Sequence, residues 1–558
     1  MNLTKLTNRH KHPFIKAYQE RQKNILDLFS YNNIDDSNYK HRINDIKIML
    51  SSNSNIANRM NIAEVLTKYH EKLAQINDQS AISFDVQKNI NAISNGAITI
   101  VSGQQAGLFT GPIYTINKIV SLLRMCTDLS GKFNESIIPV FWIAGEDHDI
   151  DEVDHLYLNS ANNIQKVSAK WRNKPRTSIA EVKLTKEQLI NIIDQLKAIM
   201  TDSIYKKDIL NELYNIYINE SISVAFAAVL YKLFSPYGLI FFDSHDNSIR
   251  QYEKDVLITI VRESIEISDA IEVGFQNYLK TGHQPQIVSE YNKLGIFVNI
   301  NGRRCSIHRN NNDKFFIQHA NIEITKDDLI QLINDKPYIF STNVLLRPIM
   351  QEFLFQPLVY IGGQAEVMYW AQLQPIFEIF RYKMPIVKLR NSYTFITRNL
   401  SLKLQKYEVI DYSIINKESF WKRNILAKTN NNFDIISDFN KLENDMLDIF
   451  NEHIDSIPEI FIDRNFVKEI SNQKWKKIHE QLNDLQVRIV NEHNKRHEIL
   501  RSELNWIENE ILPLNKLQER VLNIFYFINI LGYDFIDNLI NYKDNVIEGE
   551  HFLVKVES

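Results

Sequence analysis

The chain is poor in cysteine, in excess charge of either sign and in long apolar runs. Its 558 residues include only two cysteines, Cys126 and Cys305. That count excludes a disulfide scaffold and any zinc or iron–sulfur site built from several cysteines, and it predicts a location in the reducing cytoplasm. With 64 Lys and Arg against 68 Asp and Glu, the formal net charge is −4. We therefore expect no overall attraction to nucleic acid or to an anionic membrane.

No stretch of the sequence is apolar enough to predict a membrane helix or a secretion signal. Residues Met1 to His12 are polar and basic and lack the apolar segment of a signal peptide. The most apolar late segment, Val521 to Leu531, is interrupted by Asn523 and Asn529 and is shorter than the ~18 apolar residues of a membrane span. We expect a buried core helix there instead.

Two short apolar runs predict neighbouring strands of a parallel sheet in an α/β fold. Ala97 to Val101 has β-type composition, ends at Ser102-Gly103, and is followed by a helical pattern from Tyr114 to Met125. The next run, Ile137 to Ile143, is nearly all apolar, as expected for a strand buried on both faces. Strand, loop, helix and strand form a βαβ unit, which predicts a Rossmann-like core.

Changes in the pattern divide the remaining chain, whose length predicts about two to four domains. The Asn301-Gly302 dipeptide between two strand patterns, Leu294 to Ile300 and Arg303 to His308, predicts a β-hairpin with a type I′ turn. The predicted parts are residues 1–155 (N-terminal helices and the first part of the core), 156–230 (a mostly helical insertion), 231–390 (the second part of the core with the hairpin insertion), 391–512 (a helical coiled-coil domain) and 513–558 (a helix and a strand that pack back on the core).

The segment from Trp475 to Leu512 contains neither Pro nor Gly and would be ~57 Å long as one continuous helix. Its apolar positions alternate by three and four residues, with one shift at His493, which is the pattern of a coiled-coil seam. The seam could join two chains as a homodimer, or pair with another helix of the same chain. Both hold if a helical hairpin also dimerises.

A glycine-rich segment between the predicted strand and helix is the first candidate binding site. It contains Gly103, Gly107 and Gly111 at four-residue intervals, which allows a sharp turn and a close approach of the backbone to a ligand. The start of the following helix favours an anion. The segment matches neither the Walker A loop nor the dinucleotide fingerprint, and a tight strand–helix connection is the alternative interpretation.

An acidic segment follows the second predicted strand, where open α/β sheets bind ligands. Between Glu146 and His155 it holds six carboxylates and two histidines, which could bind a divalent metal, hold an ammonium group or supply a general base. A solvated acidic loop that caps the next helix is the alternative.

A third group of polar residues lies around Arg347 and Glu366. The planar fork of Arg347 suits a carboxylate or a phosphate, although a structural ion pair would use it equally well. Glu366 follows the strand pattern Leu358 to Ile361, which breaks at Gly362-Gly363, and so marks a further strand-end site.

These segments together resemble the bacillithiol biosynthesis cysteine-adding enzymes, the BshC family. The matching stretches, which extend the resemblance over essentially the whole chain, are Ser102 to Thr115, Pro139 to Asp149, Leu345 to Gln351, Gly362-Gly363 and Tyr369 to Leu373. One departure is Gln364-Ala365, where the family more often has Pro-Gly.

The resemblance implies a Rossmann-like core with connecting-peptide insertions like those of class I aminoacyl-tRNA synthetases, and a coiled coil used for dimerisation. It also implies the last step of bacillithiol synthesis, in which a ligase joins L-cysteine to the amine of glucosaminyl-malate through an amide. The implied cofactor is ATP, with Mg²⁺ as an optional companion. The implied partners are the two small-molecule substrates and a second copy of the chain, without nucleic acid, membrane or resident metal.

Amide formation needs an activated carboxyl, a cradle for the activating phosphate and a base for the amine proton, and we assign residues to these tasks. The nucleotide- and phosphate-binding residues are Gly103, Gly107, Thr110 and Gly111; the catalytic residues are Glu146, His148 and Asp149; and the substrate-binding residues are Gln104, Gln105, Arg347, Gln351, Glu366 and Tyr369. Two other classes stay open: a metal-dependent hydrolase built on the Glu146–His155 cluster, and a non-catalytic dimeric scaffold.

Overall fold

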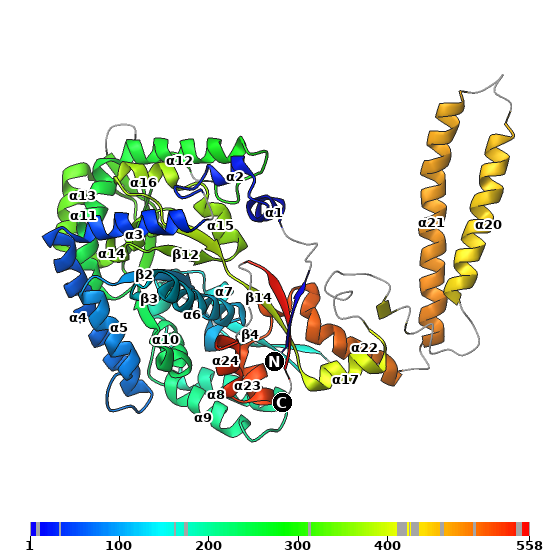
Figure 1. The fold of residues 1–558 in the computed structure, drawn as a ribbon, viewed down its shortest axis with the longest axis horizontal. Helices are drawn as coiled ribbons and strands as arrows, with labels where there is room; N and C mark the ends of the chain where they lie inside the picture. Colours follow the sequence, from blue (N-terminus) through cyan, green and yellow to red (C-terminus); the bar gives the residue numbers. More distant parts are fainter. Residues whose placement is uncertain are drawn as a thin grey trace. The chain divides into compact units, whose positions relative to one another are not determined.

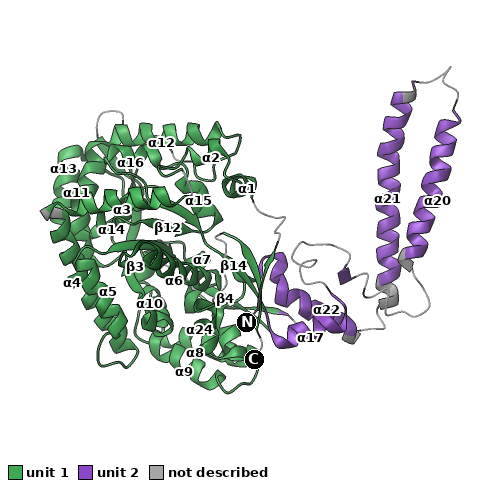
Figure 2. Ribbon diagram, viewed as in Figure 1, with its two compact units in different colours: residues 1–160, 164–395, 518–558 green, residues 161–163, 396–517 purple. Residues whose placement is uncertain are grey.

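The computed structural model contains two compact units, each described here by itself (Figures 1 and 2). Unit 1 comprises residues 1–160, 164–395 and 518–558, and unit 2 comprises residues 161–163 and 396–517. The structure describes all residues except 1, 7–11, 33–34, 161–162, 172–176, 289, 311–313, 410–420, 423–424, 426–434, 458–462, 495–497, 543–548 and 557–558.

A five-stranded parallel sheet forms the centre of unit 1. Its strands are β2 (Ile98–Gln104), β3 (Ile137–Ile143), β6 (Ile240–Asp243), β12 (Val359–Gly362) and β13 (Ile386–Leu389). They lie side by side in the order β6-β3-β2-β12-β13, which is the doubly wound order 3-2-1-4-5 of a Rossmann fold. Every residue of β3 is buried, because neighbouring layers cover both faces of the sheet. The predicted Rossmann-like core is therefore confirmed.

Helices surround this sheet in unit 1 (Figure 1). Helix α6 joins β2 to β3 and packs against both strands and β12, while α5 contacts β3 and β6. The helices of the N-terminal region and of the β2–β3 crossover are α1 (Pro13–Gln19), α2 (Lys23–Leu26), α3 (Asp36–Leu50), α4 (Asn53–Ile76), α5 (Phe84–Ser94) and α6 (Tyr114–Phe133).

The first insertion lies between β3 and β6. It is mostly helical, and its additional feature is an antiparallel hairpin, in which Leu156 pairs with Val167. Its elements are α7 (Ile150–Val153), β4 (His155–Asn159), β5 (Ile164–Ser168), α8 (Lys186–Ile199), α9 (Lys206–Tyr217) and α10 (Ile222–Phe234).

The second insertion lies between β6 and β12 and carries an antiparallel sheet of order β10-β9-β8-β7-β11. Its β7–β8 hairpin turns at Asn301 and Gly302, whose φ angles of 53° and 77° are those that a type I′ turn requires. The elements are α11 (Asn247–Arg262), α12 (Ser264–Leu279), β7 (Lys293–Ile300), β8 (Arg303–Arg309), β9 (Lys314–Ile317), β10 (Ile322–Thr325), α13 (Lys326–Asp335), β11 (Phe340–Thr342) and α14 (Arg347–Phe355).

The C-terminal segment of unit 1 returns to the N-terminus in a three-stranded sheet of order β1-β15-β14. The apolar run that predicted a core helix forms α23, whose Phe527 and Ile528 are fully buried. No helix in the described ranges is long and apolar enough to cross a membrane. The remaining elements of unit 1 are β1 (Asn2–Leu6), α15 (Gln364–Trp370), α16 (Gln374–Ile379), β14 (Ser392–Ile396), α23 (Ile524–Leu531), α24 (Asp534–Ile540) and β15 (His551–Lys555).

Unit 2 is helical and contains an antiparallel helical hairpin formed by α20 and α21 (Figure 1). Phe450 lies beside Trp475 with the rings tilted and their centroids 5.6 Å apart, and Glu443 contacts His479. Residues earlier in α20 therefore contact residues later in α21, as in an antiparallel pair. The seam thus pairs two helices of one chain. The helices are α17 (Arg398–Lys406), α20 (Ile435–Asp455), α21 (Arg464–Asn494) and α22 (Glu498–Ile511).

The long helix predicted from Trp475 to Leu512 is observed as α21 and α22. The three residues between them lie outside the described residues, and so does the side chain of His493, where the seam was predicted to shift. Leu485 and Ile489 of the predicted seam stay 47% and 41% exposed. Pairing with α20 thus leaves part of the apolar face of α21 uncovered.

Candidate active site

A cavity of about 540 Å³ opens at the carboxyl ends of β2, β3 and β12. The strand order reverses between β2 and β12, and open α/β sheets bind ligands at such switch points. Both insertions and the C-terminal segment of unit 1 complete the wall. The lining residues with polar or charged side chains are Gln104, Gln105, Tyr114, Lys118, Trp142, Glu146, Asp147, Glu152, Arg304, Thr342, Asn343, Arg347, Gln364, Glu366, Tyr369, Arg390 and Arg520.

Lys118, on the first turns of α6, reaches back to the end of β2. Its Nζ donates to the carbonyl oxygen of Gly103 at 2.6 Å and to Oε1 of Gln104 at 2.7 Å. It also lies 2.5 Å from Oε2 of Glu366. Burial lowers the pKa of Lys118, against the opposing charge of Glu366. Lys118 therefore joins the two strands that flank the switch point.

Glu366 is the anionic partner in this pair and lies on the first turn of α15. Burial alone would raise the pKa of Glu366, but Lys118, the Gly363 amide and the Tyr360 hydroxyl together hold it below its usual value. Tyr360 donates to Oε1 at 2.6 Å and the Gly363 N–H donates to Oε2 at 2.7 Å. Glu366 is thus ionised and fixed in place.

Arg347 begins α14 and contacts only neutral side chains. Its Nη2 donates to the Tyr369 hydroxyl at 2.5 Å and to the Tyr360 hydroxyl at 3.5 Å. Burial acts to lower the pKa of Arg347, but the two phenols raise it on balance. Arg347 stays charged, and no carboxylate of the described residues lies within ion-pair distance of it.

Arg390, by contrast, follows β13 and has a buried carboxylate of its own. Its Nη1 and Nη2 donate to the two oxygens of Glu519 at 2.7 Å and 2.9 Å. Asn117 also donates to Glu519, at 2.8 Å. Burial would raise the pKa of Glu519, but Arg390 lowers it to about 2. The next residue along the chain, Arg520, is exposed and lines the cavity.

Arg304, from β8 of the second insertion, enters the cavity from the side of β3. Its Nε donates to Ser341 Oγ at 3.0 Å and its Nη2 to the Thr342 carbonyl at 2.9 Å. Burial lowers the pKa of Arg304. The nearest carboxylate is Asp147, 4.0 Å away, and Asp147 already accepts a hydrogen bond from Gln105 at 2.5 Å.

The structure brings seven of the thirteen predicted site residues to this cavity. They are Gly103, Gln104, Gln105, Glu146, Arg347, Glu366 and Tyr369. The six residues that do not line it are Gly107, Thr110, Gly111, His148, Asp149 and Gln351. Gln351 is fully buried, and its amide has no hydrogen-bond partner among the described residues.

The lower part of the glycine-rich segment turns away from the cavity, which is why Gly107, Thr110 and Gly111 do not line it. The φ angles of Thr110 and Gly111 are 75° and 64°, and a Cβ on Gly107 would lie 2.9 Å from the Gly111 Cα. Asn523 donates to the carbonyl oxygens of Phe109 and Gly111 at 2.8 Å and 2.7 Å. This part of the loop therefore packs against the C-terminal segment, and Thr110 Oγ1 is buried without a partner among the described residues.

The acidic segment spreads its side chains in different directions. Glu146 is buried and forms an ion pair with Arg250, while Asp149 is exposed. The half-exposed His148 lies outside the lining, with its Nδ1 3.4 Å from Arg304 Nη1 and 3.6 Å from Asp147 Oδ1. In the described part of the chain, no three His, Cys, Asp or Glu side chains converge as metal ligands.

Six charged residues of the cavity were not predicted as site residues: Lys118, Asp147, Glu152, Arg304, Arg390 and Arg520. Lys118 and Asp147 are close in sequence to predicted residues. The available signal was the position of Lys118 about one turn into a helix and the position of Asp147 just after a strand. Arg304 lies in a hairpin, and Arg520 is more than 100 residues from any other part of the site. The sequence pattern gave no indication of either.

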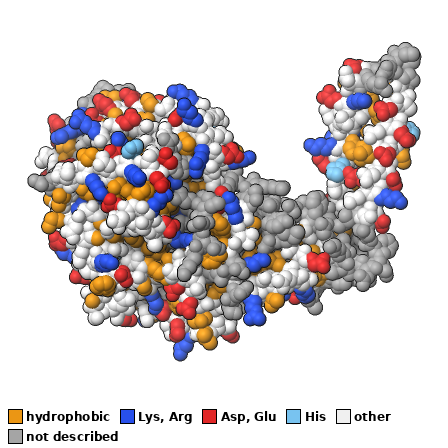
Figure 3. Space-filling view, in the orientation of Figure 1, with side chains coloured by type: hydrophobic (Ala, Val, Ile, Leu, Met, Phe, Trp, Pro, Cys, Tyr) orange, Lys and Arg blue, Asp and Glu red, His pale blue; other side chains and the backbone are white. Residues whose placement is uncertain are grey.

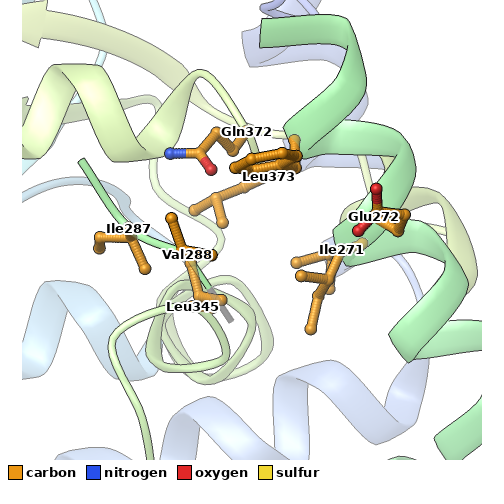
Figure 4. A pocket seen from close by; sticks show the side chains of 9 residues that line it. Ile271, Glu272, Ile287, Val288, Leu345, Gln372 and Leu373 are labelled. Atoms are coloured by element: carbon orange, nitrogen blue, oxygen red, sulfur yellow. The ribbon is translucent and has the colours of Figure 1, made fainter. Parts of the chain in front are cut away.

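The surface of unit 1 outside this cavity includes two smaller pockets among its described residues. Its visible face mixes acidic and basic side chains (Figure 3), in line with the nearly balanced net charge. A second pocket, of about 40 Å³, lies beside α12 and has mostly aliphatic walls that include Ile271, Val288 and Leu373 (Figure 4). It holds few groups that could take part in chemistry.

Comparisons with known proteins identify the family. Residues 1–391 match the family model described as "Bacillithiol biosynthesis BshC, N-terminal Rossmann-like domain", and residues 393–556 match "Bacillithiol biosynthesis BshC, C-terminal coiled-coil domain". The predicted coiled-coil domain is thereby confirmed. A solved structure described as a "putative arginyl T-RNA synthetase" from Campylobacter jejuni matches 79% of this chain and 98% of its own at 9% identity, with a TM-score of 0.22, which is too low to support an argument.

Two curated relatives are each described as "Putative cysteine ligase BshC". The protein from Bacillus cytotoxicus is 29% identical over 89% of this chain and 91% of its own length. The protein from Bacillus thuringiensis strain Al Hakam is 28% identical over 97% of this chain and 98% of its own. With both domain models matched in order along nearly the full length, the chain belongs to the bacillithiol biosynthesis BshC family.

Proposed function

We propose that this chain is a cysteine ligase of bacillithiol biosynthesis, which joins L-cysteine to the amine of glucosaminyl-malate in an ATP-dependent reaction that forms an amide. The observation that carries this proposal is the cavity at the switch point, which combines fixed cations with fixed carboxylates. Its volume of about 540 Å³ is in the range of small-molecule sites. The family membership of the chain supports the same reaction.

The charged groups of the cavity suit the two substrates. Cysteine and glucosaminyl-malate both carry carboxylates, which the planar guanidinium groups of Arg304 and Arg347 can bind through paired hydrogen bonds. Both substrates also carry an amine, which is an ammonium ion at neutral pH. Glu366 is the ionised carboxylate best placed to hold such a group in the cavity.

His148 remains the proposed base for the amine proton. It stands beside Asp147, which lines the cavity, and histidine is the side chain that most often serves as a general base. Glu146 is proposed to act indirectly, since its carboxylate is engaged by Arg250. Asp149 is proposed to contribute negative charge to the acidic segment that carries His148.

The residues present also fit the phosphates of ATP. The Gly103–Gln105 segment and the exposed Arg520 lie together on the cavity wall, and a phosphate would supply activation of the cysteine carboxyl there. Gly107, Thr110 and Gly111 would contribute by shaping the loop that leads away from Gly103. Mg²⁺, where ATP brings it, would find Asp147 and Glu152 on the same wall.

A direct assay tests the reaction. Purified chain would be incubated with L-cysteine, glucosaminyl-malate, ATP and Mg²⁺, and the amide product measured by mass spectrometry. We expect product only when all three substrates are present, and at least a ~100-fold lower rate for His148→Ala, in line with the contribution of a general base. Product without ATP would refute ATP dependence, and no product under any condition would refute the ligase assignment.

We also propose that the chain forms a homodimer through α21. Leu485 and Ile489 are the exposed apolar residues of its seam, and burial of each is worth ~1.5–3 kcal/mol. Sedimentation of the purified chain should show a dimer, and the double variant Leu485→Asp/Ile489→Asp should sediment as a monomer. The matched control is Asp484→Asn on the same helix. A wild-type monomer at micromolar concentration would refute this proposal.

A further inference from the structure

Two arginines of the cavity have no carboxylate partner within hydrogen-bond distance. Arg304 is held by Ser341 Oγ and by the Thr342 carbonyl, and Arg347 is held by two phenol oxygens. The other buried cations of the cavity are compensated, because Lys118 contacts Glu366 and Arg390 contacts Glu519.

This difference points to a ligand. Arginine stays protonated in proteins, and a charge that is removed from water is costly unless an opposite charge meets it. Arg304 is buried with only 9% of its side chain exposed, and Asp147, at 4.0 Å, is its nearest carboxylate. Glu146 and Asp147 offset part of the Arg304 charge and Glu366 offsets part of the Arg347 charge, in each case without a hydrogen bond. A bound anion that accepts hydrogen bonds from the two guanidinium groups would complete the compensation.

Arg304 and Arg347 line the same cavity and are both hydrogen-bonded to one turn of its wall. Arg304 donates to the carbonyl oxygen of Thr342, and the backbone N–H of Arg347 donates to the carbonyl oxygen of Asn343 at 2.9 Å. Residues 342–344 line the cavity between them. Phe297 lies under the Arg304 guanidinium at 4.0 Å from its ring centroid, which supports one flat face and leaves N–H groups at the edge for a ligand.

We propose that Arg304 and Arg347 together form a dicarboxylate site that binds the malyl group of glucosaminyl-malate, with one carboxylate at each guanidinium. This inference rests on the proposed function and specifies which substrate part the site recognises. In a malyl glycoside both carboxylates are free and separated by a short carbon chain. Two arginines that line one cavity from separate elements, β8 and α14, offer one guanidinium to each carboxylate of the malyl group.

Binding of free L-malate tests the site without any turnover. Isothermal titration of the full chain would compare L-malate with L-lactate, which lacks the second carboxylate, and with inorganic phosphate and ATP. We expect L-malate to bind at least ~10-fold more tightly than L-lactate or phosphate, since each charge-assisted contact contributes about a factor of ten or more. Equal binding of L-lactate and L-malate, or tighter binding of phosphate, would overturn the dicarboxylate assignment.

Variants locate the site. Arg304→Gln and Arg347→Gln should each weaken L-malate binding at least ~10-fold. Arg303→Gln is the matched control, because alternate residues of β8 face opposite sides and Arg303 does not line the cavity. If Arg304→Gln has a lower melting temperature than the wild type, Arg304→Lys is the second variant. It keeps the charge, so it should retain the wild-type melting temperature and lose less affinity for L-malate. Unchanged L-malate affinity in either Gln variant would overturn the proposal.

Turnover separates this inference from the ligase assignment. With glucosaminyl-malate as substrate, Arg304→Gln should raise its KM at least ~10-fold while the KM for L-cysteine stays the same. A wild-type chain that binds L-malate as described but forms no amide would refute the ligase assignment alone. An active chain whose KM for glucosaminyl-malate is unaffected by Arg304→Gln would refute the dicarboxylate site alone.

Discussion

Arg390 and Arg347 line the same cavity but differ in how their charges are compensated. Arg390 forms a two-pronged ion pair with the buried Glu519, whereas Arg347 meets only the hydroxyls of Tyr369 and Tyr360. The first arginine is part of the structural framework, which ties β13 to the C-terminal segment. The second has no carboxylate of the described residues within ion-pair distance, and the charge of Glu366 acts on it only from farther away, so its guanidinium is available to a ligand.

The largest expected effect follows from breaking the compensated pair. Glu519→Ala would leave the buried Arg390 charge without a partner, which typically costs about 3–5 kcal/mol of unfolding free energy. Urea denaturation of the full chain, followed by tryptophan fluorescence, measures the change.

The control for this variant is Arg347→Gln, which removes a cavity arginine that has no ion pair. Its cost in unfolding free energy should be smaller, about 1–2 kcal/mol, because hydrogen bonds to neutral phenols are lost but no buried charge loses an ion-pair partner. If the two variants were destabilised equally, the distinction between a framework arginine and a ligand-binding arginine would be refuted.

The same pair predicts a dependence on pH. Arg390 lowers the pKa of Glu519 to about 2, so the pair stabilises the folded chain above the ordinary Glu pKa of ~4.3 and loses that stabilisation as the pH falls toward 2. The full contribution is on the order of 3 kcal/mol. Glu519→Gln removes the titrating group, so the difference in unfolding free energy between wild type and variant should shrink as the pH is lowered from 5 toward ~2. A difference that stays constant over this range would contradict the role of the ion pair.

The smallest expected effect concerns the neutral partner of Arg347. Tyr369→Phe removes the hydroxyl that lies 2.5 Å from Nη2 but leaves the ring in place. We expect an increase of about 3- to 10-fold in the KM for glucosaminyl-malate, because one hydrogen bond that positions the Arg347 guanidinium is lost, with little change in kcat. Steady-state kinetics measures it, and Tyr382→Phe, outside the cavity lining, is the control. A fall in kcat at unchanged KM would contradict a purely binding role.

The sequence predicted the parts of the fold that depend on local pattern. The continuous apolar run of β3 and the strand–loop–helix order after β2 were sufficient to predict the parallel sheet, and sheet geometry then placed Gln104, Glu146 and Glu366 at one cavity. Such strand-end positions are predictable, because parallel strands present their carboxyl ends at the same edge.

The sequence did not predict groups whose position depends on tertiary packing. Arg304 comes from an inserted hairpin, and Arg390 acquires its partner Glu519 from 129 residues further along the chain. Thr110 was expected at the cavity, but its loop turns away and packs against Asn523. Residue type and spacing carry no record of such long-range contacts.

The central claim is that the cavity at the β2–β12 switch point binds the substrate of the ligation. A crystal structure of the full chain with glucosaminyl-malate tests it most directly. We predict that the malyl carboxylates lie within hydrogen-bond distance of Arg304 and Arg347, and that the sugar amine faces Glu366. Ordered substrate at any other site, with this cavity occupied only by water, would contradict the account.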